Sequence, residues 1–274
     1  MIDVQQILDH EPHIRMIAFV GIFVGMATCE LIWPRRALTL SKGLRWISNL
    51  GLVVFNTVLA RIILPMAPVA FAALCVDRGW GLFNLVELPL WSEVLVTIVI
   101  MDFTIWAQHV MVHVVPIFWR LHRVHHADQD YDVTTGARFH PLEILLSLGI
   151  KFAVIAVIGA SPVAVLFFEV ILNAMAMFNH ANVRLPLGLD AVLRLVVVTP
   201  DFHRVHHSVI VQETNANYGF NLSVWDRLFR TYVAQPQLGH LDMKIGLDEF
   251  RGTTEQRLDK ILSQPFRKAK ETER

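Results

Sequence analysis

The stretch "LWSEVLVTIVIMDFTIWAQHVMVH", residues 90–113, decides the fold because it joins a long apolar segment to a pair of histidines. The segment from Leu90 to about Met111 is long enough to cross the hydrocarbon core of a bilayer as a helix, which takes about 20 residues. His109 and His113 are four residues apart, so on a helix they lie about 40° apart on one face. The stretch therefore predicts a membrane span with two potential metal ligands at its end.

The composition of the whole chain favours a membrane protein. Of its 274 residues, 54% are hydrophobic and 18% are charged, and the mean hydropathy is +0.47. Soluble domains have about 45–50% apolar and about 25% charged residues. The formal net charge is zero, which gives no case for a nucleic-acid partner. Cys29 and Cys75 both lie in apolar segments, so neither a thiolate metal cluster nor a disulfide is expected.

Apolar stretches along the chain predict an all-α, multi-span membrane protein with about five spans. The other four cover about residues 16–33, 47–74, 142–158 and 162–178. Arg61, Pro65 and Pro68 divide the second of these, so it is expected to be either one tilted helix or two shorter pieces. The polar N-terminus lacks the basic-then-apolar order of a cleavable signal peptide.

The pentapeptide "HRVHH" occurs twice, at residues 122–126 and 203–207. On a helix, the three histidines of each copy fall within an arc of about 100°. Buried imidazoles that crowd together without a charge partner are costly, so a purely structural role is disfavoured. Eight nitrogen ligands exceed the needs of one ion. The pattern therefore predicts a two-metal site formed by His109, His113, His122, His125, His126, His203, His206 and His207.

Further polar residues lie close to this pattern. His180 in "FNHANV" ends the fifth span and is expected to be an additional ligand. His140 in "RFHPLE" is expected to be either a ligand or a residue that supports one. Asp102 lies seven residues before His109, on nearly the same helical face, and is expected to orient a ligating imidazole, with a structural ion pair as the alternative. Asp201 is expected either to cap its helix or to bond an imidazole.

The segment after the second pentapeptide offers supporting residues. Asn217 in "NYG" is expected either to face the metal site or to form a turn. Asp226 is expected to pair with Arg227. Trp225 and Phe229 suit the boundary between membrane and water. Structural roles are expected for the isolated histidines, which are His10, His13 and His240.

The ligand chemistry favours a redox-active metal pair. Imidazole ligands suit zinc, copper, nickel or iron. Structural zinc prefers four ligands and usually thiolates, which disfavours it here. Lipid C–H bonds resist acids, bases and nucleophiles, so attacking them requires an oxidant carried by a metal. Two irons supplied with dioxygen fit both the ligand count and the place beside a bilayer. The sequence has no flavin, haem or nicotinamide motif, so electrons are expected from a separate partner.

Basic residues indicate the orientation in the membrane. They gather in the loop after the first span, around both pentapeptides and in the C-terminal tail, whereas residues 77–87 carry one arginine and two acids. Cytoplasmic loops carry the excess of lysine and arginine. With five spans, the N-terminus is expected outside, and both histidine triplets and the C-terminus in the cytoplasm.

The chain resembles the fatty acid hydroxylase/sterol desaturase superfamily in an ordered set of motifs: "HVMVH" (109–113), "LHRVHH" (121–126), "RFHPLE" (138–143), "NHANV" (179–183), "TPDFHRVHHS" (199–208) and "NYGFNLSVWDRLFRTY" (217–232). Hydropathy predicts membrane spans at 1–90, the resemblance implies a catalytic region with a cytoplasmic helical cap at 91–235, and the polar sequence of 236–274 predicts a tail. It implies two irons held by the nine histidines named above, with His140 as a tenth candidate, although zinc could occupy the site in isolated protein. Ala176 stands where fatty acid 2-hydroxylases carry a further histidine.

The implied activity is dioxygen-dependent hydroxylation of a lipid, such as a sterol, carotenoid, fatty acyl chain or ether lipid. Electrons would come through a reductase with ferredoxin or cytochrome b5. A desaturase of the same family is the nearest alternative, because both reactions begin with the same hydrogen abstraction. A transition-metal transporter is the alternative from another class, but carriers place ionisable residues within their spans. A bacterial inner membrane and the endoplasmic reticulum both fit the sequence.

Overall fold

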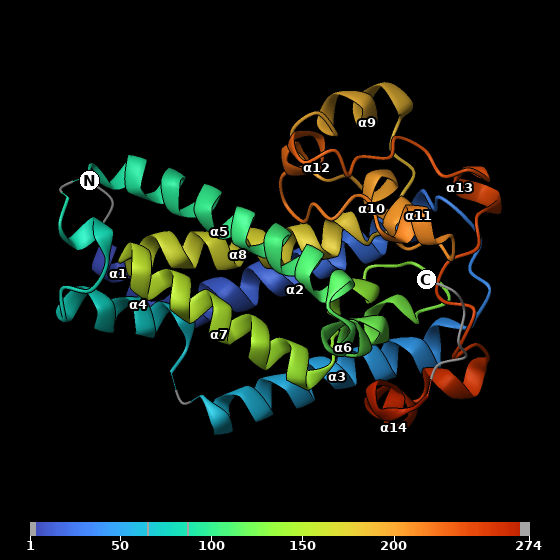
Figure 1. Ribbon diagram of the computed structural model, residues 1–274, viewed down its shortest axis with the longest axis horizontal. Helices are drawn as coiled ribbons and strands as arrows, with labels where there is room; N and C mark the ends of the chain where they lie inside the picture. Colours follow the sequence, from blue (N-terminus) through green and yellow to red (C-terminus); the bar gives the residue numbers. More distant parts are fainter. Residues whose placement is uncertain (1–3, 65, 87, 269–274) are drawn as a thin grey trace.

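The structure is a computed structural model that describes residues 4–64, 66–86 and 88–268. Long helices run roughly side by side, and short helices gather at one end of them (Figure 1). The bundle consists of α1 (Val4–Asp9), α2 (Glu11–Ile32), α3 (Lys42–Ile63), α4 (Pro68–Asp77), η1 (Leu82–Asn84), α5 (Leu90–Val114), α7 (Pro141–Ile158) and α8 (Pro162–Asn179). The remaining helices, which we name the cap, are α6 (Pro116–His126), η2 (Thr135–Ala137), α9 (Leu187–Leu193), α10 (Pro200–His206), α11 (Val211–Thr214), α12 (Val224–Leu228), α13 (Gly239–Asp242), η3 (Thr253–Gln256), α14 (Leu258–Ser263) and η4 (Gln264–Phe266).

Five segments of the described chain are long and apolar enough to cross a membrane: Glu11–Ile32, Lys42–Asn84, Leu90–Val114, Pro141–Ile158 and Pro162–Asn179. The prediction of an all-α protein with about five spans is confirmed. The divided segment consists of two helices, because α3 ends at Ile63 and α4 begins at Pro68. Proline lacks the backbone N–H of a helix interior and disfavours helical backbone in the residue before it.

The bundle has an apolar interior and an apolar outside. Ala72 of α4, Met101 of α5, Ile155 of α7 and Phe168 of α8 are fully buried in one core cluster. Many equally apolar side chains point outward, and Ile62 is 73% exposed. A helix that is apolar all round belongs either in a large core or in a bilayer. The outward apolar side chains therefore fit a lipid-facing surface.

Proline and capping side chains position the helices that carry the histidines. Proline is the first residue of α6, α7, α8 and α10, where its missing N–H costs nothing and its φ suits the helix. Ser161 and Thr199 accept hydrogen bonds from backbone N–H groups in the first turns of α8 and α10. Pro116 begins α6 directly after α5, so the chain changes direction between the first two histidine motifs.

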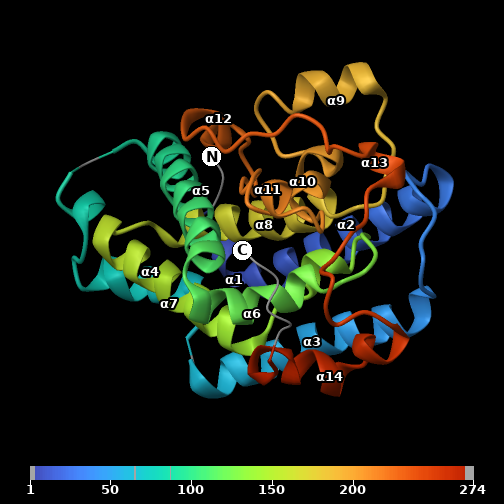
Figure 2. The same cartoon turned by 45° about the vertical axis from the view of Figure 1, so that its right-hand side comes forward.

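The C-terminal segment folds back onto the protein. Figure 2 shows α14 beside α3. Ile261 of α14 is fully buried against Leu52 and Val124. The expected polar tail is therefore packed against the protein at α14, and its last residues lie outside the described chain. The expected boundaries at residues 90 and 235 remain predictions.

A buried ion-pair network ties α3 to the loop that follows α6. Arg45 donates to both carboxylate oxygens of Asp128, at 2.7 and 2.9 Å, and to Asp132 at 2.7 Å. Burial raises the pKa of Asp128, but the charges of Arg45 and Arg138 outweigh burial and hold it at about 2. The Asp128 carboxylate thus stabilises the fold fully above its ordinary pKa of 3.8, and this contribution disappears as the pH falls toward 2.

We expect Arg45→Met to lower the free energy of unfolding by about 3 kcal/mol, because it leaves two buried carboxylates without their cation. Thermal unfolding of the purified protein in detergent measures the loss. Lys244→Met is the matched control, since Lys244 pairs with Asp248 on the surface and such pairs contribute about 0–1 kcal/mol. Equal losses in the two variants would contradict a structural role for the Arg45 network.

Candidate metal centre

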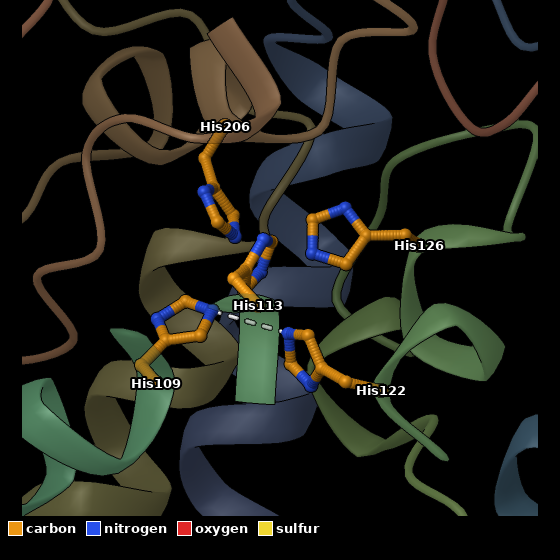
Figure 3. A group of neighbouring side chains, drawn as sticks. All are labelled: His109, His113, His122, His126 and His206. Carbon is orange, nitrogen blue, oxygen red and sulfur yellow. Dashed lines mark hydrogen bonds between the residues drawn. The ribbon is translucent and has the colours of Figure 1, made fainter. Parts of the chain in front are cut away.

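Nine buried histidines meet where the bundle joins the cap. They come from the end of α5, from α6, from the residue that follows α8, and from α10 and the residue after it. They form two groups, and within each group one nitrogen atom per residue lies within 4.8 Å of those of the others. The first group, shown in Figure 3, is His109, His113, His122, His126 and His206. The second group is His125, His180, His203 and His207.

The two pentapeptides share both groups in a way that follows from helix geometry. Residues four apart lie on one helical face, and each such pair stays in one group: His122 with His126, and His203 with His207. The remaining histidine of each copy crosses to the other group. The ring of His126 lies 4.6 Å from the ring of His206 and 4.6 Å from that of His207. The two triplets are therefore in direct contact.

One loop supplies hydrogen-bond partners for three imidazoles of the first group. The Nδ1 atom of His109 lies 2.7 Å from the carbonyl oxygen of Tyr218, and Nδ1 of His206 lies 2.7 Å from that of Ala216. Nδ1 of His113 lies 3.3 Å from Oδ1 of Asn215. A carbonyl oxygen only accepts, so these Nδ1 atoms carry the proton and each Nε2 keeps its lone pair. Partners of this kind fix the tautomer of metal-binding histidines.

The Nε2 atoms of His122 and His109 face each other in a way that is unfavourable without a metal ion. Nδ1 of His122 donates to the carboxylate of Glu143 at 2.6 Å, so its Nε2 also carries a lone pair. This atom faces the Nε2 atom of His109 at 3.2 Å, the contact dashed in Figure 3. Two neutral lone pairs at this distance repel. Two nitrogens bound about 2.1 Å from one tetrahedral or octahedral ion are themselves about 3.0–3.4 Å apart, which matches the observed contact.

The second group brings two ring nitrogens equally close together. Nδ1 of His180 lies 2.8 Å from the carbonyl oxygen of Ala176, and its Nε2 lies 3.1 Å from Nε2 of His125. The loop residue Gly136 packs on that carbonyl so closely that a Cβ atom there would lie 2.3 Å from the oxygen. The backbone thus fixes the His180 ring from two sides.

Several imidazole nitrogens are buried with no hydrogen-bond partner among the described residues. Leaving a buried polar group unpaired costs about 1–3 kcal/mol, so each such atom requires an explanation. A metal pair bound between the rings would satisfy one nitrogen of each ring. The atoms are His113 Nε2, His125 Nδ1, both ring nitrogens of His126, His203 and His207, and His206 Nε2.

The electrostatics keep these rings in the form that binds metals. Burial and the neighbouring His207 lower the pKa of His126 well below its ordinary value of 6.5. Burial lowers the pKa of His206 to about 3, against the hydrogen bond to Ala216 that raises it. Imidazoles with such pKa values are neutral at physiological pH, and the neutral ring is the metal ligand.

Comparison with known proteins identifies the family. The sequence model of the fatty acid hydroxylases matches residues 94–231, which is about half of the chain and includes every histidine of both groups. The chain belongs to the fatty acid hydroxylase family. The family resemblance predicted from the motifs is thereby confirmed.

Individual members of the family are similar over larger or smaller parts of the chain. An ornithine lipid hydroxylase of Rhizobium tropici is 30% identical over 178 residues, which cover 65% of this chain and 51% of that protein. An alkylglycerol monooxygenase of Xenopus tropicalis is 31% identical over 242 residues, covering 86% and 50%. A methylsterol monooxygenase of Arabidopsis thaliana is 27% identical over 169 residues, covering 60% and 62%. The chain thus spans about half the length of the first two relatives. No solved structure matches the chain.

Two residues expected near the metals of this family member have other contacts. His140 lies outside both groups: its Nδ1 accepts from the N–H of Leu142 at 3.2 Å and caps α7. The following proline favours extended backbone at His140, which turns its ring onto the helix start. Asp102 accepts from Trp225 at 2.7 Å and from Leu222 N, and not from a histidine as expected. It lies about 10 Å along α5 from His109, so a shared helical face does not bring them into contact.

The other expected supporting residues are structural. Asp201 accepts from Arg204 and, at 3.0 Å, from Arg35, while Thr199 caps the helix. Asp201 also lies 3.7 Å from the Nε2 atom of His240, and neither group includes that ring. Asn217 forms the turn that was one of its two expected roles, with φ of 51°.

Two carboxylates with important roles were not predicted correctly. Glu143 bonds His122, although only its place in "RFHPLE" marked it in the sequence. Asp226 does not pair with its neighbour Arg227. It accepts from the N–H groups of Tyr218 at 2.9 Å and Gly219 at 2.6 Å, which fixes the loop that holds the imidazoles.

Asn217→Ala is expected to loosen this loop. Asn217 donates to the carbonyl oxygens of Phe202 and Val233, at 2.9 and 2.8 Å, and accepts from Val233 N at 2.7 Å. Losing these bonds and placing alanine at positive φ should cost about 3 kcal/mol of unfolding free energy. Metal affinity should fall as well, because the adjacent carbonyls of Ala216 and Tyr218 hold two ligands.

Asn217→Gly serves as the control for that experiment. Glycine accepts positive φ without strain, so this variant should recover about 1 kcal/mol relative to alanine while still lacking the side-chain bonds. Chemical unfolding and metal titration measure both effects. Wild-type metal affinity in both variants would refute a positioning role for the Asn217 side chain.

Proposed function

We propose that this protein is a membrane-bound oxygenase that hydroxylates a lipid, using two iron ions held by the nine histidines. The proposal rests on the two buried imidazole groups, three of whose rings line a cavity between membrane helices. Family membership supports the reaction class. The relatives described above are named as hydroxylases or monooxygenases of ornithine lipids, alkylglycerols and methylsterols.

The ligand assignment follows the two groups. One ion would be held by the five imidazoles of the first group and the other by the four of the second group. Donor sets built from imidazole suit iron and other transition metals. His140 is not among the ligands that we propose, because its ring caps α7.

The cavity suits a lipid guest. It has a volume of about 880 Å³ and lies between α2, α3, α5, α7 and α8. His109, His122 and His125 line it at the metal centre, and apolar side chains such as Phe19 and Leu148 line it further along. A cavity of this size, mostly apolar with a few convergent polar groups, is typical of a small-molecule site.

The chain's own residues prepare the site for oxidation. The carbonyls of Ala216 and Tyr218 and the Glu143 carboxylate hold protons at Nδ1 and so direct each Nε2 inward. Phe139 stacks on His125 with ring centroids 4.4 Å apart and gives the cavity an apolar wall beside the metal centre. When bound, the metal pair would supply an oxidant derived from dioxygen that can attack an unactivated C–H bond.

Electron supply and location complete the proposal. We assign electron delivery to a separate reductase with ferredoxin or cytochrome b5, because the sequence has no flavin, haem or nicotinamide motif. The basic loops at the histidine end favour a site on the cytoplasmic side of a bacterial inner membrane or the endoplasmic reticulum.

Lipid analysis tests the function. The chain is expressed in a host, and total lipids are compared by mass spectrometry with those of a host that expresses His206→Ala. Hydroxylation adds one oxygen atom to a lipid in the wild-type sample only. Loss of two hydrogens would indicate a desaturase. Transport of metal ions into vesicles that contain the protein, with no change in any lipid, would indicate a transporter and not an oxygenase.

A further inference from the structure

The end of the cavity away from the histidines carries charged side chains. We name this set the distal charged cluster: Glu11, Arg15, Arg61, Lys151 and Glu169, all of which line the cavity. They belong to the membrane-span segments of α2, α3, α7 and α8. Ion pairs link four of the five: Lys151 lies 2.6 Å from Glu169, and Arg15 lies 3.9 Å from the other oxygen of Glu169. Arg15 also pairs with Glu11 at 2.8 Å.

Charges within spans are costly, and by default they mark a functional site. A cavity that received only a hydrocarbon tail would be stabilised by apolar walls along its whole length. Here two acidic and three basic side chains line one end, which leaves one net positive charge. Arg61 forms no ion pair within the described chain, and it is an exposed residue at the end of α3. The lining thus offers a cation to a guest with one negative charge.

Distances along α7 relate this cluster to the metal centre. Glu143, which bonds His122, and Lys151 are eight residues apart on this helix and both line the cavity. The separation corresponds to about 12 Å of helix rise. Ser147 lies midway on the same face and also lines the cavity, so one helix face leads from the histidines to the cluster.

We propose that the distal charged cluster binds the negatively charged group of an amphiphilic substrate, a carboxylate or a phosphodiester. The hydrocarbon part then points toward the histidines, and the carbon that reacts lies about 12 Å from the charged group. The proposal rests on the proposed function in one respect, namely that the guest is the substrate of the metal centre. The binding orientation itself is independent of turnover.

Photoreactive fatty acids test the orientation without any activity. One undecanoate probe, whose extended chain matches the distance from the cluster to the metal centre, carries a diazirine at its methyl end, and a second carries it beside the carboxylate. After irradiation of the purified protein in nanodiscs, the methyl-end probe should label residues near the metal centre, such as Phe139 and Ile144. The carboxylate-end probe should label α2 near Arg15 or α3 near Arg61. The reverse pattern would overturn the proposal.

Charge variants test the recognition chemistry. Arg61→Gln should weaken binding of palmitate about tenfold, the factor for loss of a charge-assisted hydrogen bond, and leave palmityl alcohol unaffected. Arg78→Gln is the matched control, an exposed arginine beyond α4 that does not line the cavity. If the cluster is only structural, Arg61→Gln would change both ligands equally or neither, and the proposal fails. Competition by lysophosphatidylglycerol against palmitate distinguishes a phosphodiester from a carboxylate.

The two proposals fail separately. The expected labelling without any oxidised lipid would refute the oxygenase proposal but support the binding role of the distal charged cluster. Oxidised lipid together with reversed labelling would refute the binding role of the distal charged cluster but support the oxygenase proposal. Metal content measured in every variant shows whether the metal centre is intact.

Discussion

His126→Ala is expected to abolish lipid oxidation and to release at least one of the two metal ions. The His126 ring is fully buried and neither of its nitrogens has a hydrogen-bond partner among the described residues, so one of them is available to a metal ion. Its ring also lies beside those of His206 and His207, so it contacts both groups. Elemental analysis of the purified protein and mass spectrometry of lipid products measure the two effects.

His140→Ala is the matched control, because it removes a histidine of the same motif region that lies outside both groups. It should retain both metals and most activity. It should lose about 1 kcal/mol of unfolding free energy, since its side chain caps α7. Full metal content in His126→Ala, or metal loss in His140→Ala, would show that the ligand assignment is wrong.

The histidine spacing predicted the centre because helix geometry is local. Residues at i and i+4 share a face, so His109 with His113 and His122 with His126 each had to act together. The approach of α6 to α10 is a tertiary contact that periodicity does not encode. The specific and repeated motif made that contact predictable where hydropathy alone could not.

The partners of the imidazoles were less predictable. The acceptors for His109 and His206 are backbone carbonyls, and any residue type provides one. The contact expected between Asp102 and His109 was wrong for a different reason: the two residues share a helical face but lie two turns apart. Lys151 and Glu169 could have been singled out from the sequence, since charged residues inside apolar spans are rare. Their pairing across α7 and α8 places them in the cavity wall.

Glu143→Leu is expected to lower metal affinity about 10–100-fold, the usual effect of removing a group that orients a metal-binding histidine. Glu143 holds the proton on Nδ1 of His122 at 2.6 Å and thereby keeps the Nε2 lone pair directed at His109. Without the carboxylate, the ring is free to adopt the other tautomer, in which Nε2 carries the proton and no longer binds metal.

Glu143→Gln separates this positioning role from a general effect of charge or packing. The amide oxygen can still accept from Nδ1, so glutamine should retain affinity within about tenfold of the wild type, whereas leucine of similar size should not. Metal titration against a competing chelator gives both affinities, and thermal unfolding of the metal-free proteins shows whether either fold has changed. Wild-type affinity in both variants would mean that the His122 tautomer does not depend on this hydrogen bond. A large loss with glutamine as well would instead show that the negative charge beside His122 is itself required to hold the cation.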